Sequence, residues 1–473
     1  MNEKSINDVQ VASALDEVKQ KDEENRMGTM PINKLLFVMS TPMVISMLVQ
    51  ALYNVVDSMF VAQINQQALT AVSMAFPIQN LMIAFSAGTG VGINALLSRS
   101  LGEGNKKDAQ AAACNGIFLG ILSSIIFMIF GFVGARAFFA SQTSDEQIIG
   151  YGVEYVSVIC IGSIGIFLQI TLERIMQSTG KTVFNMITQT TGAVFNIIFD
   201  PILIFGLFGF PKMGVTGAAL ATVGGQILGM LLSFVFNARY NEEVHVTLKG
   251  FRPSSHIIKQ IYSVGLPSII MQSISSVMVY LLNQILMSFE ETAVTVFGVY
   301  YKLQSFVFMP VFGLNNGMIP IVAYNYGASK KDRIMKTMRL AVIAASTMMV
   351  IGVAIFMVFP EKLLGIFKAS ENMLSLGVPA LRIISLSFIL AGYNIVVGSM
   401  FQALGNGVYS LIVSVMRQIV VIVPVAFVLS RFCGATGVWL SYPIAEIVAV
   451  ATNIILFTKT KKMKIDRLVT RAV

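Results

Sequence analysis

The chain has 473 residues, of which 55% are hydrophobic and only 12% are charged, and its formal net charge is +9. Soluble domains carry about 25% charged residues, so this composition excludes a soluble globular protein and predicts a polytopic membrane protein. The basic residues lie in short loops between apolar stretches, where they indicate membrane topology and not nucleic-acid binding. We therefore expect membrane lipid around the chain and no nucleic-acid partner.

Runs of about 20 apolar residues predict twelve membrane-spanning helices and an all-α fold. The spans lie at roughly 34–62, 70–97, 109–138, 149–176, 183–207, 215–238, 260–288, 294–323, 334–360, 376–403, 409–432 and 435–458. Lysine and arginine gather in the loops after the even-numbered spans up to the eighth, and in residues 459–473. The positive-inside rule then predicts that both termini are cytoplasmic, in the plasma membrane of a bacterium.

The chain contains an internal repeat. Equivalent residues are separated by 225 positions (267 − 42, 327 − 102 and 405 − 180), and they are Pro42 and Pro267, Gly102 and Gly327, and Gly180 and Gly405. Because six spans return the chain to its starting side, two parallel six-helix halves follow, as in many transporters. We expect the halves at 31–238 and 260–458, a cytoplasmic linker at 239–259, a disordered cytoplasmic tail at 1–30 and a basic cytoplasmic tail at 459–473.

A polar face interrupts the first apolar span. Gln50, Tyr53, Asn54 and Asp57 are three or four residues apart and share one side of a helix. A carboxylate at the centre of a membrane helix costs roughly 2.5 to 3.5 kcal/mol, so such residues usually face the bundle interior and mark an ion or substrate path. Asp57 is therefore the first candidate functional residue.

A second acid lies in the fifth span. Asn196 and Asp200 are four residues apart on one helix face, and Pro201 leaves the carbonyl of Ile197 without its helical donor. Oxygens from Asp57, Asn196 and Asp200 could hold a proton or a hard cation such as sodium. The alternative is a purely structural hydrogen-bonded pair of helices with one carboxyl group protonated. Proline within spans, notably Pro42 and Pro201, also predicts helix hinges.

Neither acid has a counterpart in the second half. The equivalent positions are Leu282 (57 + 225) and Val425 (200 + 225). A repeat with carboxylates in one half only favours a functional role for them over a structural one.

Other charged residues within the spans leave two interpretations open. Glu446 lies in the last span, and the same half supplies positive charge, so a structural ion pair and a transport role are equally compatible with the sequence; the cations are Lys302, Arg382 and Arg417. Glu173 and Arg174 lie near a helix end, where both side chains could reach the membrane surface.

Enzyme motifs are not found. Gly180-Lys181-Thr182 resembles the end of a phosphate-binding loop, but the glycine that this loop needs five residues earlier is Ile175. We expect no enzymatic activity and no cofactor other than a coupling ion.

The combined motifs resemble the multidrug and toxic compound extrusion (MATE) family, in its DinF- and MepA-like branch. They are the Tyr53-to-Asp57 face, Asn196-x-x-x-Asp200-Pro201, and Gly217-Ala-Ala-Leu-Ala-Thr222. The resemblance covers essentially everything after residue 30. It implies export of cationic and amphipathic drugs in exchange for protons or sodium by alternating access, by a protein that we expect to be a monomer.

The resemblance also assigns residues. Asp57, Asn196, Asp200 and Thr222 match the family's cation-coupling cluster, and the substrate cavity would be lined by Gln50, Tyr53 and Asn54. NorM-type members carry further acids in the seventh and tenth helices, but this chain has Met271-Gln272-Ser273-Ile274-Ser275 and Ala391-Gly392-Tyr393-Asn394 there. The departure implies ion coupling in the first half alone.

Three other functions remain as alternatives. A lipid-linked oligosaccharide flippase could share the topology, and the cations of the second half keep this reading open, although the centre of the first half is acidic where a pyrophosphate headgroup would need positive charge. A channel fits the asymmetric carboxylates less well than an exchanger does. A membrane enzyme would require a catalytic constellation, and no known one is recognisable in the sequence.

Overall fold

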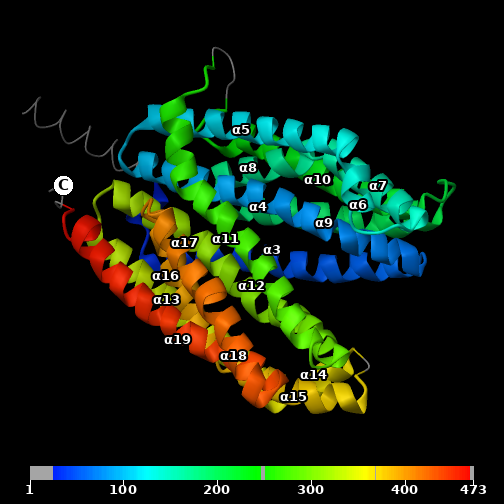
Figure 1. Cartoon of the computed structure of the whole chain (residues 1–473). Coiled ribbons are helices and arrows are strands. Elements are labelled where there is room, and N and C mark those ends of the chain that lie inside the picture. The colour runs from blue at the N-terminus through cyan, green and yellow to red at the C-terminus, as the bar shows by residue number, and fades with distance from the viewer. Residues whose placement is uncertain (1–24, 247–250, 368, 469–473) are drawn as a thin grey trace, which may run out of the picture.

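The computed structural model describes residues 25–246, 251–367 and 369–468, which form helices and connecting loops without a strand among them. Figure 1 shows two bundles that lie together at the end where the C-terminus is found and diverge toward the opposite end. We call these the terminal end and the open end. At the open end, α6 and α7 of one bundle face α14 and α15 of the other across the divergence.

The first bundle follows the expected order of spans. Its helices are α3 (Ile32–Ala62), α4 (Gln66–Gly102), α5 (Lys106–Val133), α6 (Ala135–Ala140), α7 (Glu146–Ile161), α8 (Ile164–Ser178), α9 (Thr182–Phe205) and α10 (Gly214–Tyr240).

The second bundle repeats this order. Its helices are α11 (Ser255–Met287), α12 (Glu291–Gly327), α13 (Lys331–Val358), α14 (Pro360–Gly365), α15 (Glu371–Ser385), α16 (Phe388–Ala403), α17 (Gly407–Val415), the π-helix η1 (Met416–Ile422), α18 (Val423–Cys433), α19 (Ala435–Thr460) and the π-helix η2 (Lys461–Ile465).

Ten helical segments of the described chain are long and apolar enough to span a membrane, and two bent pairs bring the number to twelve. The fourth and tenth predicted spans are the two bent pairs. Helices α7 and α8 meet at an angle of 42°, and α15 and α16 meet at 48°. The two bends occupy equivalent places in the repeat, since α15 begins 225 residues after α7 (371 − 146).

The halves exchange their first helices at the terminal end. The start of α3 packs into the core of the second half, where Leu35 and Met39 are fully buried. In the same way, Ile257 and Ile261 of α11 pack with Ile93 of the first half. The two bundles are therefore crossed and not merely adjacent.

Glycines allow the helix backbones to approach closely at the two crossings. A Cβ atom at Gly92 would lie 2.1 Å from the carbonyl oxygen of Ile261, and one at Gly317, 225 residues later, would lie 2.7 Å from Cα of Ser40. Positions without a Cβ atom let helix backbones approach closely in membranes, where small residues dominate helix interfaces. The repeat thus places the same small residue at both crossings.

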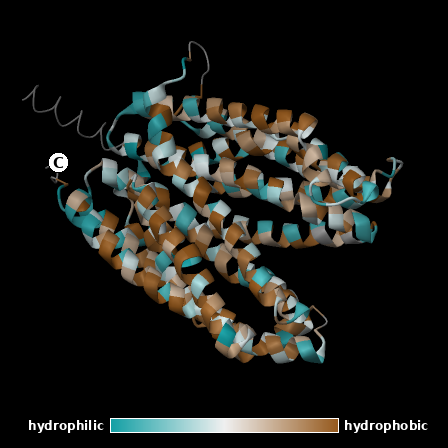
Figure 2. Cartoon of the chain, in the orientation of Figure 1, coloured by the Kyte–Doolittle hydropathy of each residue, from teal (hydrophilic) through white to brown (hydrophobic). Residues whose placement is uncertain are grey.

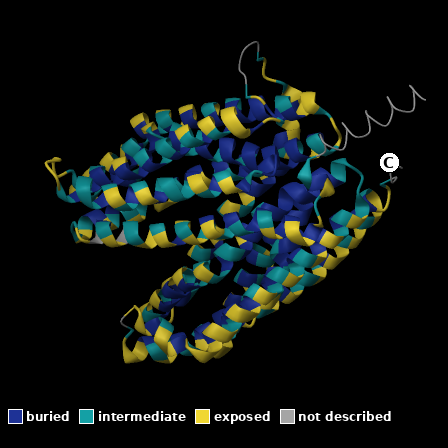
Figure 3. Ribbon diagram, turned by 180° about the vertical axis from the view of Figure 1, so that it is seen from behind, coloured by how far each residue is buried: buried dark blue, intermediate teal, exposed yellow. Residues whose placement is uncertain are grey.

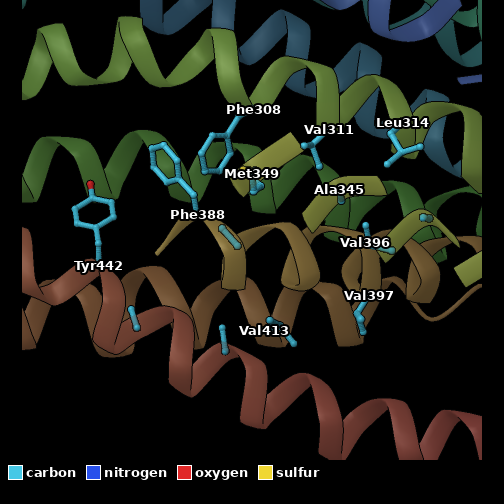
Figure 4. Close-up of a cluster of buried hydrophobic side chains, with 14 of the residues drawn as sticks. Phe308, Val311, Leu314, Ala345, Met349, Phe388, Val396, Val397, Val413 and Tyr442 are labelled. Carbon is cyan, nitrogen blue, oxygen red and sulfur yellow. The ribbon is translucent and has the colours of Figure 1, made fainter. Parts of the chain in front are cut away.

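Buried side chains lie between the bundles, and the outer surface is also apolar, as a membrane protein requires. Figure 3 shows buried residues concentrated where the bundles meet, and Figure 4 shows part of the second half's core, with Phe308 and Phe388 among its side chains. Figure 2 shows hydrophobic residues along the outer helix surfaces as well. On α5 the exposed apolar residues recur at helical spacing, and they are Leu122, Ile125, Ile126, Ile129, Phe132 and Val133. An apolar stripe of this size suits lipid and not water.

Helical structure extends into both segments that the sequence predicted to be tails. Residues 1–24 and 469–473 lie outside the described residues, but α2 (Arg26–Thr29) is a short helix in which Met27 is fully buried. At the other terminus, η2 continues α19 through residues that we expected to be a tail. In each case a few apolar residues, Met27 and Ile465, are buried in the second half's core and hold the backbone in place. Part of the predicted linker, residues 247–250, lies outside the described residues.

We predict that Gly92→Ala lowers the melting temperature of the purified protein, because the added methyl group must displace α11 at a cost of about 1 to 3 kcal/mol. Gly298→Ala is the matched control, since a Cβ atom there meets nothing within 4 Å. Thermal unfolding followed in detergent measures both variants, and equal melting temperatures for the two would contradict the close crossing.

Candidate functional site

The structure brings the two candidate acids together. Asp57 on α3 and Asp200 on α9 lie close enough to interact directly, although they are 143 residues apart in the sequence (200 − 57). Asp200 has no exposed surface, and Asp57 is half-buried. Two carboxyl groups can share a hydrogen bond only if one of them carries a proton, because a carboxylate can only accept.

Asn196 and Thr222 complete this pair. The Asn196 amide donates from its nitrogen to an Asp200 oxygen at 2.7 Å, and its oxygen accepts from the backbone N–H of Thr222 at 3.1 Å and from the Thr222 hydroxyl at 3.2 Å. In this orientation, the nitrogen and the oxygen of the Asn196 amide each have a suitable hydrogen-bond partner. Asn196 lies one helical turn before Asp200, and Thr222 comes from α10, so three helices converge on the cluster.

Two tyrosines extend the network. Tyr53, one turn before Asp57, lies close to Thr222 and to both acids. Tyr155 of α7 is buried and lies close enough to Asp57 and Asp200 to interact with both electrostatically, and its hydroxyl accepts a hydrogen bond of 2.9 Å from Gln79 of α4. We did not predict Tyr155 or Gln79, because neither breaks the repeat or the helical pattern in a visible way.

The remaining predicted residues lie on the same two helices. Gln50 and Asn54 are exposed on α3. Pro42 and Pro201 lie inside α3 and α9, and the Ser46 hydroxyl donates to the Pro42 carbonyl at 2.9 Å. Both helices are continuous through their prolines, and a hinge role for Pro42 and Pro201 stays a prediction.

The cluster offers two carboxyl groups, an amide and hydroxyls as ligands. These oxygen donors suit a proton or a hard monovalent cation, and they do not suit transition metals, which prefer imidazole and thiolate. Within the described ranges, no group of three or more histidine, cysteine, aspartate or glutamate side chains could hold a metal ion.

The second half has a buried ion pair and not a second carboxyl pair. Arg417, in η1, donates to Glu446 at 2.8 Å, and Asn394 donates to the other Glu446 oxygen at 2.6 Å. Lys302 and Arg382 are exposed, so Arg417 is the cation that Glu446 contacts. Leu282, the counterpart of Asp57, is buried among apolar side chains.

Glu173 and Arg174 do not reach the membrane surface, contrary to expectation. The Glu173 carboxylate accepts hydrogen bonds from three side chains at 3.0, 2.8 and 2.7 Å, namely those of Gln169, Thr188 and Gln189. Arg174 donates instead to Asn316 of α12 at 3.0 Å. Both side chains are held inside the bundle because polar partners are available there, which the sequence spacing did not reveal.

A repeated, crossed helical bundle with ionisable groups at its centre defines a polytopic membrane transporter. Comparison with known proteins identifies its family. The MatE family profile matches residues 42–202 and 267–428, and the chain belongs to this family. Its two matched stretches begin 225 residues apart (267 − 42), at Pro42 and Pro267.

Curated relatives and solved structures agree with this assignment. The chain is 26% identical over 438 residues to the multidrug export protein MepA of Staphylococcus haemolyticus (strain JCSC1435), which spans 92% of this chain and 96% of the relative. It is 24% identical to MepA of Staphylococcus aureus (strain MRSA252) over the same shares of both chains.

Among solved structures, an outward-facing multidrug resistance MATE family transporter of the MOP superfamily superposes with a TM-score of 0.88 at 26% identity, covering 94% of this chain and 98% of the other. A MOP superfamily transporter from Pyrococcus furiosus, whose binding pocket is described as reversed in polarity, superposes with a TM-score of 0.86 at 26% identity and the same coverage. The chain is therefore a multi-pass membrane transporter and not an enzyme.

We predict that Thr222→Val destabilises the protein by about 1 kcal/mol, because it removes a hydroxyl that hydrogen-bonds to Asn196 in the buried cluster while keeping the side-chain shape. Thr216→Val on the same helix is the control, since the Thr216 hydroxyl donates to Glu154 at the exposed surface. Thermal unfolding measures both variants, and an equal drop in their melting temperatures would contradict the network.

Proposed function

We propose that this protein is a multidrug efflux antiporter, which exports cationic and amphipathic drugs in exchange for protons or sodium ions. The observation that carries the proposal is the contact between Asp57 and Asp200 in the first half. Two like unit charges about 4 Å apart repel each other by roughly 4 kcal/mol at an effective dielectric constant of about 20. The pair therefore needs a positive partner, which a proton, a sodium ion or a drug cation can provide.

Competition for that partner would give exchange. When a proton or sodium ion neutralises the pair, the site no longer attracts a drug cation, and when the ion leaves, the attraction returns. A ligand shifts a conformational equilibrium only through its different affinities for the two states, so the ion-bound and drug-bound proteins can favour opposite openings.

The orientation follows from charge. By the positive-inside rule both termini are cytoplasmic, which makes the terminal end the cytoplasmic end and the divergence of the two halves an opening toward the outside. Substrate would then lie between the halves, next to the exposed Gln50 and Asn54 and the half-buried Tyr53 on α3. The names of the MepA relatives support a drug as substrate.

The coupling ion would bind in the first half alone. Asp57, Asn196, Asp200 and Thr222 would form its site, as the asymmetry of the repeat favours. In the second half, Glu446 is neutralised by Arg417 in a partly buried ion pair, which leaves it without the excess charge that a coupled cation requires.

Transport measurements test the proposal. In vesicles that carry the purified protein, an imposed proton or sodium gradient should drive ethidium transport, and the gradient that works identifies the ion. Asp57→Asn and Asp200→Asn should each abolish gradient-driven transport, because an amide cannot bind and release a proton.

Glu154→Gln is the control for these variants, since Glu154 is an exposed carboxylate of the same half. Retained coupling in both aspartate variants would remove the pair from the mechanism. Absence of transport of any cationic dye by the folded wild-type protein would favour a flippase for lipid-linked sugars, and a lipid-linked oligosaccharide would be the next substrate to test.

A further inference from the structure

The short helix α2 (Arg26–Thr29) lies against the second half at the terminal end. The guanidinium of Arg333 donates to the carbonyl oxygens of Met27 at 2.9 Å and Met30 at 2.8 Å. Asn325 donates to the Met27 carbonyl at 3.0 Å, and Lys330 donates to the Gly28 carbonyl at 3.2 Å. With the Met27 side chain fully buried in the second half's core, α2 is held firmly on this side.

The residues at the start of α2 reach across to the first half. The Asn25 amide donates to the carboxylate of Glu243, in the loop after α10, and to the carbonyl of Thr179 at 3.5 Å. The Arg26 guanidinium donates to the carbonyl of Gly180. Thr179 and Gly180 form the turn between α8 and α9, so the contacts join α2 to the helix pair that includes the Asp200 helix.

The same end of α8 is held by α12 as well. Arg174 donates to the side-chain oxygen of Asn316 at 3.0 Å, and the Gln177 amide donates to the Asn316 backbone carbonyl. Two sets of contacts from the second half, one from α12 inside the bundle and one from α2 at its surface, therefore fix the end of α8. Both must part if the halves separate at the terminal end.

We propose that Asn25 and Arg26 form a strut that keeps the terminal end closed, and that the strut detaches from the first half whenever that end opens. Detachment occurs on the first-half side, because Arg333 and the buried Met27 keep α2 on the second half. The proposal rests on alternating access in the proposed function, and it assigns a conformational role to two residues that precede the first membrane span and do not belong to the Asp57 cluster.

A distance measurement tests the strut independently of any transport assay. Spin labels at Lys107 and Lys336, exposed residues of the first and second halves near the terminal end, report the separation of the halves in nanodiscs. Asn25→Ala combined with Arg26→Ala should raise the ratio of separated to closed populations about tenfold, since hydrogen bonds to charged groups are the stronger kind. Lys34→Ala is the matched control, because it removes an exposed cation from the start of α3.

Unchanged distance populations in the double variant, with a normal melting temperature, would overturn the strut. If the double variant does not fold, a reversible cross-link tests the same contact. In a variant without Cys114, Cys160 and Cys433, cysteines replace Asn25 and Glu243, whose side chains touch. The oxidised protein should keep the spin-label distance closed under every gradient and lose ethidium transport, and reduction should restore both.

Full transport by the oxidised, cross-linked protein would also overturn the strut. The two proposals fail in different ways. If neither the oxidised nor the reduced protein transports a dye under any gradient, drug efflux is refuted, while the spin-label distances still decide whether the strut controls the terminal end.

Discussion

Helix α3 packs its first turns into the second half and presents Asp57, near its other end, to Asp200 of the first half. Ser40 shows the first contact directly, since its hydroxyl donates to the carbonyl of Leu314 in α12 at 3.2 Å. Any rearrangement of one half against the other must therefore bend α3 or move it relative to one of its two partners. The helix that carries the charged residue is the helix that couples the halves mechanically.

Because of this placement, the carboxyl pair can influence how the two halves meet. The occupant of the Asp57 and Asp200 pair changes the charge between α3 and α9, and the position of α3 depends on how the halves meet. Pro42 lies close to the crossing with α12, because a Cβ atom at Gly313 would touch Val44. The strut at α2 continues directly into α3, so the closed terminal end and the acidic cluster are joined by a single continuous stretch of chain.

The sequence predicted much of this arrangement for a simple reason. The apolar runs must be about as long as the membrane is thick, and a duplicated half repeats its prolines and glycines at a fixed interval, so the helices and their order were readable. Asp57 and Asp200 were found because their counterparts are Leu282 and Val425, and Asn196 because it shares a helix face with Asp200. Thr222 was assigned by the family resemblance alone. Their contact in space follows from the family resemblance and from the fold together.

Other features depend on packing that the sequence does not display. The bends after α7 and α15 and the π-helix at Met416 lie inside predicted spans, where the few polar residues did not mark a change of direction. Tyr155 joins the cluster only because α7 packs beside it. In the sequence, Glu173 and Arg174 are a charged pair near a helix end. In the structure, neighbouring helices supply hydrogen-bonding partners for both side chains inside the bundle. The docking of α2 depends on Arg333 and Gly180, which are distant in sequence and have no shared pattern.

The most direct test of the account is whether drug and ion compete for the same carboxyl pair. Ethidium would be added to the purified protein in a lightly buffered detergent solution, and proton release would be followed with a pH indicator, with and without sodium. We predict that binding releases a proton, or is displaced by sodium, in the wild type and does neither in Asp57→Asn. Tight ethidium binding by the wild type with no proton release and no sodium competition would contradict the account.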